Sequence, residues 1–99
     1  MNRTEYKARI EELRPLEVAS YLRAAGWIQS ESREGRYAIW TRDDEYEVLL
    51  PLSRDLRDFA LRMGDLLAVL SQVEDRFQNS ILSDLLDPPL VAEQRKEPK

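Results

Sequence analysis

The spacing of apolar residues changes twice along this chain, and these changes restrict the fold more than any single residue does. Up to Gly26, apolar side chains recur every three or four residues, as on one face of a helix. From Trp27 to Leu50 they alternate with polar residues, as in half-buried strands, and from Leu56 onward the helical spacing returns. The pattern predicts an α+β domain with a three-stranded antiparallel sheet packed by amphipathic helices, in the order α-α-β-β-β-α-α.

Two short helices are predicted before the strands. The first carries an apolar stripe of Tyr6, Ile10 and Leu13, and so short a helix must dock on the rest of the domain to persist. Pro15 suits the first turn of the second helix, and Gly26 suits a left-handed end to it. A break is expected at Arg14, because the residue before a proline is biased away from helical geometry.

Turn-forming residues divide the alternating segment into three strands, at 27–33, 36–42 and 45–50. In the third strand, the side chains of Tyr46, Val48 and Leu50 should face the core. Glu47 and Leu49 should then face the solvent. Pro51 is expected to close the sheet, since it has no N–H to donate to a ladder.

A long helix capped by Ser53 or Asp55 should follow the sheet and anchor the core. Its apolar face comprises Leu56, Phe59, Ala60, Met63, Leu66, Leu67 and Leu70. Asp75 and Gln78 have the spacing of a capping box and predict a last helix. The apolar residues of that helix are Phe77, Ile81, Leu82, Leu85 and Leu86. We expect one domain over residues 1–87 and a disordered tail over 88–99.

The chain contains no histidine and no cysteine, and this absence argues against an enzyme. No side chain titrates unaided near neutral pH, and no thiolate is present to act as nucleophile or soft metal ligand. The serines have no histidine to activate them, and Asp55, Asp58 and Asp65 are interpreted as a solvated helix face. We therefore expect no catalytic residue, no metal and no cofactor.

The formal net charge of −4 disfavours nucleic acid, whose non-specific binding depends on a basic surface. No apolar run approaches the ~18 residues that a membrane-spanning helix needs. We expect a cytoplasmic protein with no membrane contact.

The two last helices carry more apolar residues than one small sheet can cover. Leu61 lies on the far side of the long helix from its apolar face, and Val69 lies between the two faces. Leu82 and Leu86 belong to an apolar stripe that spreads over more than a third of the circumference of the last helix. Either the terminal helices wrap the long one or a second chain covers these residues. The favoured interpretation is a non-catalytic module for protein binding or self-association through Leu61, Val69, Leu82 and Leu86, acting as a homo-oligomer or with a protein partner.

The alternative is an RNA-binding module, because arginines and aromatic residues gather around the strand turns and the start of the long helix. The residues of this alternative site are Arg36, Tyr37, Trp40, Arg42, Arg54 and Arg57. Acidic residues in the same segment, among them Glu31 and Glu47, oppose it.

The chain resembles the HicA family of mRNA-cleaving toxins, which have a double-stranded-RNA-binding-like fold, and three groups of residues carry the resemblance. They are the sequence Leu22-Arg23-Ala24-Ala25-Gly26-Trp27, Gly35 in the first turn, and Val48-Leu49-Leu50-Pro51. The resemblance covers about Pro15 to Leu70. It implies an RNA-cleaving scaffold from a bacterial toxin or defence system, but the family's catalytic histidine is replaced in the segment Gly35-Arg36-Tyr37-Ala38. A phenol with a pKa near 10 is a poor general base, so the resemblance implies the scaffold, with an accessory or regulatory role or a degenerate ribonuclease.

Overall fold

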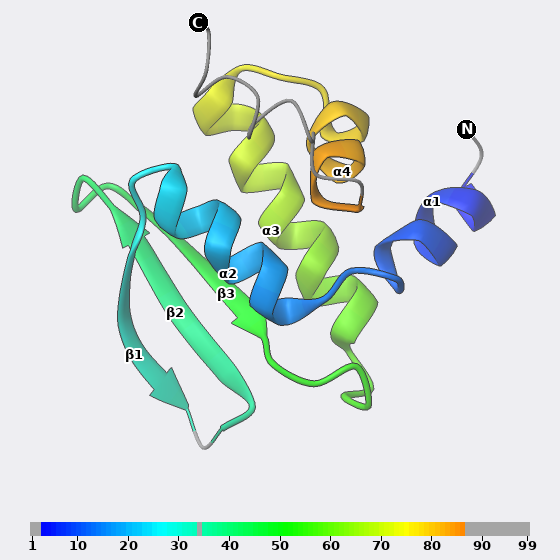
Figure 1. Ribbon diagram of the computed structural model, residues 1–99, viewed down its shortest axis with the longest axis horizontal. Helices are drawn as coiled ribbons and strands as arrows, with labels where there is room; N and C mark the ends of the chain where they lie inside the picture. The colour runs from blue at the N-terminus through cyan, green and yellow to red at the C-terminus, as the bar shows by residue number, and fades with distance from the viewer. Residues whose placement is uncertain (1–2, 34, 87–99) are drawn as a thin grey trace, which may run out of the picture.

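The computed structural model describes residues 3–33 and 35–86 and confirms the predicted α+β fold and element order (Figure 1). The elements are α1 Arg3–Ile10, α2 Pro15–Ala24, β1 Ile28–Arg33, β2 Tyr37–Arg42, β3 Tyr46–Pro51, α3 Phe59–Glu74 and α4 Gln78–Leu86. The predicted tail over 88–99, like the domain boundary at residue 87, lies outside the described residues.

The strands form one antiparallel sheet in the order β1-β2-β3. Asp43 and Asp44, with φ values of 58° and 57°, turn the chain between β2 and β3. Aspartate tolerates this left-handed region better than most residues do. A register shift between Gln29 and Glu31 makes a bulge in β1. Pro51 is the last residue of β3, opposite Tyr37, one residue beyond the predicted end of the strand.

The helices cover one face of this sheet (Figure 1). Ala38 and Trp40 of β2, with Val48 and Leu50 of β3, lie in the core cluster on that face. Helix α3 packs mainly against β3, and α2 contacts both β1 and β3. Helix α3 supplies Phe59, Met63, Leu66, Leu67 and Leu70 to the core, all at most 3% exposed. Leu56, predicted on the same face, lies half-buried in the preceding turn.

The N-terminal segment follows its prediction except at Leu13, which lies in the connection after α1 and not on that helix. Arg14 is extended, with φ −108° and ψ 123°, and separates α1 from a helix that begins at Pro15. Gly26 ends the turn after α2 with φ 94°. Ile10 and Leu13 are 3% and 1% exposed. Burial of such side chains is worth roughly 1.5–3 kcal/mol each, so docking holds the short α1 in place.

The predicted start of the long helix is wrong. Neither Ser53 nor Asp55 caps α3, because residues 54–58 form turns and the helix begins at Phe59. The Asp55 amide donates to Ser53 Oγ at 3.1 Å, within the loop. Arg54 donates to the carbonyls of Glu12 and Leu13 at 2.6 and 3.2 Å. These bonds hold the loop before α3 against the α1–α2 junction.

The predicted capping box at Asp75 is also wrong. Asp75 adopts the left-handed conformation, with φ 57° and ψ 48°, and its amide donates to the Ser71 carbonyl. Residues in this conformation end helices. Asp75 therefore terminates α3, and α4 begins only at Gln78. Phe77, predicted on the apolar face of the last helix, lies in the connection and is 84% exposed.

Candidate interaction surface

Leu61 is the predicted partner-binding residue that the structure places at an open apolar surface. It is 62% exposed and lines a groove of about 370 Å³ between α1 and α3. The groove residues are Tyr6, Lys7 and Ile10 of α1 and Ala60, Leu61, Gly64 and Asp65 of α3. Its walls are apolar, and one lysine and one aspartate contribute to its lining. Such a groove matches apolar segments of other proteins better than a phosphate backbone.

Small residues on α3 let α1 approach closely at this groove. A Cβ atom placed on Gly64 would lie 3.9 Å from Ile10 Cδ1, so the two helices are nearly in van der Waals contact there. Helix α1 is also tied to α4, since the Tyr6 hydroxyl donates to Gln78 Oε1 and Arg9 donates to Ser83 Oγ at 3.4 Å. The groove therefore lies between two helices that are each held in place by contacts with the rest of the domain.

The other three predicted partner-binding residues have different positions. Leu82 is 0% exposed, so its assignment to a partner surface is wrong. The reason is that α4 contacts α1, α2 and α3, and these neighbours cover both Ile81 and Leu82. Val69 and Leu86 are half-buried and pack against the core cluster. Leu86 also lines a separate, more polar hollow with Glu17.

The aromatic residues of the alternative RNA site are not available for stacking as predicted. Trp40 is 2% exposed and faces the core, so its assignment as a base-stacking residue is wrong. Its ring is covered from the α2 side by the Arg23 guanidinium, 5.5 Å from the ring centroid, a cation–π arrangement. Tyr37 is half-buried, and its hydroxyl donates to the Asp58 carboxylate at 2.8 and 3.0 Å.

The four arginines of that site do not form a common basic patch. Arg54 binds the carbonyls of the α1–α2 junction, and Arg42 lies 3.8 Å from the carboxylate of Asp43. Arg36 and Arg57 are exposed. Charged residues of both signs therefore share this region.

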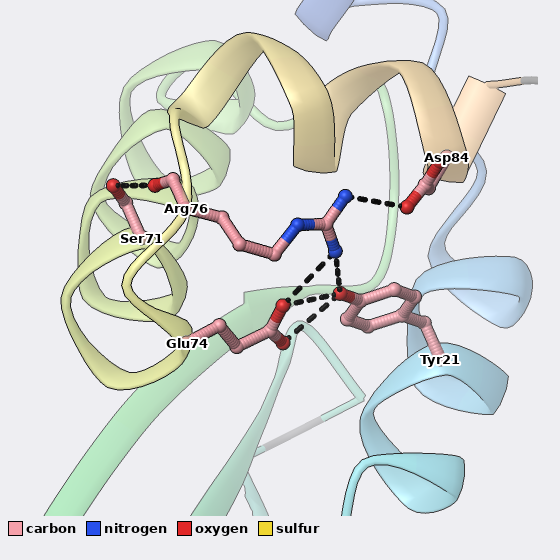
Figure 2. Close-up of polar contacts among 5 residues, drawn as sticks. All are labelled: Tyr21, Ser71, Glu74, Arg76 and Asp84. Atoms are coloured by element: carbon pink, nitrogen blue, oxygen red, sulfur yellow. Dashed lines mark hydrogen bonds and ion pairs between the residues drawn. The ribbon is translucent and has the colours of Figure 1, made fainter.

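The most connected polar cluster joins α2, α3 and α4 (Figure 2). The Arg76 guanidinium donates to Asp84 at 2.7 Å and to both Glu74 and the Tyr21 hydroxyl at 3.2 Å. The Tyr21 hydroxyl donates to the two Glu74 oxygens at 2.7 and 2.9 Å. The Ser71 hydroxyl donates to the Arg76 carbonyl. Every polar group in the cluster has a partner within it, which is the pattern of a structural clamp.

The pKa values of Tyr21, Tyr37 and Asp58 are all shifted further from pH 7. Burial, together with the hydrogen bond to Glu74, raises the pKa of Tyr21 well above its usual value. The hydrogen bond to Asp58 raises the pKa of Tyr37. The same bond, assisted by Arg62, lowers the pKa of Asp58. None of these groups is therefore poised to exchange a proton near pH 7.

Within residues 3–33 and 35–86, no group of three acidic side chains is arranged to hold a metal ion. No helix in the same ranges is both long and apolar enough to cross a bilayer. No family model, no curated protein and no solved structure matches this chain.

The sequence pattern does not predict two features of the surface. The first is the polar cluster around Arg76, which we call the Arg76 clamp. It brings together Tyr21 and Glu74, which are 53 positions apart in the sequence, and nothing in their spacing predicts a contact. Three further apolar residues are strongly exposed, namely Leu16 at 82%, Ile28 at 69% and Phe77 at 84%. The sequence does indicate one apolar position on the sheet face opposite the helices. Leu49 is apolar, yet the alternation of its strand predicts that it faces the solvent.

Proposed function

We propose that this chain is a non-catalytic interaction module that binds an apolar segment of another protein in the groove between α1 and α3. The observation that carries the proposal is the 62% exposure of Leu61 within a mainly apolar groove. An exposed leucine alone is ordinary, but a groove with anchored walls beside it is typical of a docking site.

The chemistry of the chain supports a binding role over a catalytic one. It has no histidine and no cysteine. The pKa values of Tyr21 and Tyr37 are raised and that of Asp58 is lowered, so these groups hold their protons or charge firmly at neutral pH. No part of this role depends on the resemblance to the HicA family.

A pair of matched variants tests the proposal. Leu61→Asp places a charge in the groove, and Leu16→Asp places one on α2, where Leu16 is 82% exposed. Both positions are exposed, so both variants should keep the fold, which circular dichroism checks. Affinity-tagged wild type and Leu16→Asp, recovered from the native host, should retain the same protein in a constant ratio, and Leu61→Asp should lose it. Recovery of identical proteins with Leu61→Asp would refute the groove as the binding site.

A further inference from the structure

The groove between α1 and α3 has helices for both walls, and this restricts what can bind in it. Lys7 and Ile10 belong to α1, and Leu61, Gly64 and Asp65 belong to α3. Inside a helix the backbone N–H and C=O groups bond to each other, so these walls offer no strand edge to a partner. An extended peptide would carry its own N–H and C=O groups into the groove with no row of backbone groups to pair with. A helical segment avoids this cost, because its backbone groups are already bonded.

The polar side chains that line the groove do not replace a strand edge. The Tyr6 hydroxyl already donates to Gln78 Oε1. The Asp65 carboxylate lies 3.8 Å from Arg62 Nη1 on its own helix. A partner whose backbone needs hydrogen bonds would leave most of them unmade here, and unmade bonds of desolvated groups weaken binding. The groove therefore favours a helix over an extended chain.

The volume of the groove sets how much of a partner enters it. The groove measures about 370 Å³. An apolar cavity of about 150 Å³ holds one benzene molecule, so the groove accommodates roughly two large apolar side chains. On a helix, two such side chains lie on one face when they are three or four residues apart. Ala60 and Gly64 of the α3 wall are small, so the backbone of a partner can approach α3 closely there.

Lys7 supplies the charge that a partner must match. Its side chain is exposed, and it forms no ion pair with any residue in the ranges 3–33 and 35–86. Asp65 is the other charged residue of the groove lining, and Arg62 already balances it. The groove therefore presents an ammonium group without a counter-charge beside apolar walls. A carboxylate on the partner complements this arrangement, whereas a second cation would be repelled.

We infer that the groove binds an amphipathic helix of a partner protein. Two apolar side chains of that helix, three or four residues apart, fill the groove beside Leu61, and a carboxylate on its flank pairs with Lys7. The inference rests on the proposed function, since it names the kind of segment that binds in the same groove. A helix bound there packs against both α1 and α3 and covers the exposed side chain of Leu61.

Two displayed libraries of peptides about 14 residues long, roughly four helical turns, test the helical occupant on the immobilised full chain. The first library has an alanine-rich frame that favours a helix, with the positions of one face and its flanks randomised. The second has a proline at every third position, which prevents a helix. Wild type should enrich helical peptides that carry two large apolar residues three or four apart and an acidic residue beside them. Leu61→Asp should retain none of these peptides, and the proline library should yield no binder that depends on Leu61.

A charge reversal tests the pairing with Lys7, with the affinity of the enriched peptides measured by fluorescence polarisation. Lys7→Glu should weaken binding at least about tenfold, because it sets two carboxylates against each other. Replacing the acidic residue of the peptide by lysine should restore binding to Lys7→Glu to within about threefold of wild type. Arg36→Glu makes the same change in net charge at an exposed position in the β1–β2 turn and should leave the affinity unchanged. Equal binding by wild type and Lys7→Glu would overturn the pairing.

The remaining outcomes separate this inference from the proposed function. Proline-library peptides that need Leu61 overturn the helical occupant and leave the proposed function standing. The same holds if no helical peptide depends on Leu61 while Leu61→Asp still loses the protein recovered from the native host. A wild-type dimer in sedimentation velocity that Leu61→Asp abolishes also overturns the inference, since a second copy would then occupy the groove. Loss of neither the helical peptides nor the native protein in Leu61→Asp would overturn both.

Discussion

At the scale of single residues, Tyr37 and Asp58 show how the chain uses groups that resemble catalytic ones. The Tyr37 hydroxyl donates to both oxygens of Asp58, and Arg62 Nε adds a bond at 3.1 Å. These bonds favour the charged carboxylate and the protonated phenol. The contact ties the start of β2 to the residue before α3, so its effect is on stability.

The pH dependence of unfolding tests this contact. The pKa of Asp58 is lowered in the folded state, mainly by Tyr37. Its contribution to stability is therefore complete above the unfolded pKa near 4 and is lost as pH falls through the folded value. Tyr37→Phe should be less stable than wild type at pH 6, and the gap should narrow toward pH 2 in urea titrations. A gap that stays constant over this range would show that the hydroxyl does not act through the Asp58 charge.

At the scale of elements, two glycines have opposite effects on stability. Gly26 has a φ of 94°, a conformation that alanine adopts only with strain. Gly64 is inside α3, where a Cβ would meet Ile10 Cδ1 at an ordinary contact distance of 3.9 Å. We expect Gly26→Ala to cost about 1–2 kcal/mol and Gly64→Ala to add about 0.5–1 kcal/mol, measured by chemical denaturation. Effects of the same sign would contradict the conformations assigned to these positions.

The Arg76 clamp is the main polar tie between elements. Glu74 in this clamp is only 15% exposed in its side chain, so removal of Arg76 leaves a poorly solvated carboxylate without its cation. Arg76→Ala should cost about 1–3 kcal/mol of unfolding free energy. Arg14→Ala is the matched control, because Arg14 and Glu17 form a pair at 3.5 Å that is 72% and 45% exposed. It should change stability by less than about 0.5 kcal/mol, and equal losses in the two variants would argue against the clamp.

At the scale of the whole molecule, periodicity predicted the elements well because each is defined by local spacing. The same spacing could not say which apolar residues face a neighbour. Leu61 and Leu82 both look surplus on their helices, yet α4 is enclosed by three helices and buries Leu82, whereas the outward side of α3 leaves Leu61 exposed. The predicted ends of α3 are wrong for a related reason, because contacts that are distant in sequence and a single backbone conformation set them. Arg54 holds the preceding loop through contacts about 40 positions away in sequence, and the left-handed Asp75 ends the helix where its side chain suggested a beginning.

We propose that this chain binds protein through the α1–α3 groove. A photo-reactive amino acid in place of Leu61, activated in the native host, tests it most directly, with the same group at the exposed Arg57 as control. We predict a protein adduct of one defined mass at position 61 that is absent at position 57 and resists ribonuclease. An adduct removed by ribonuclease, or the same adducts at both positions, would contradict the claim.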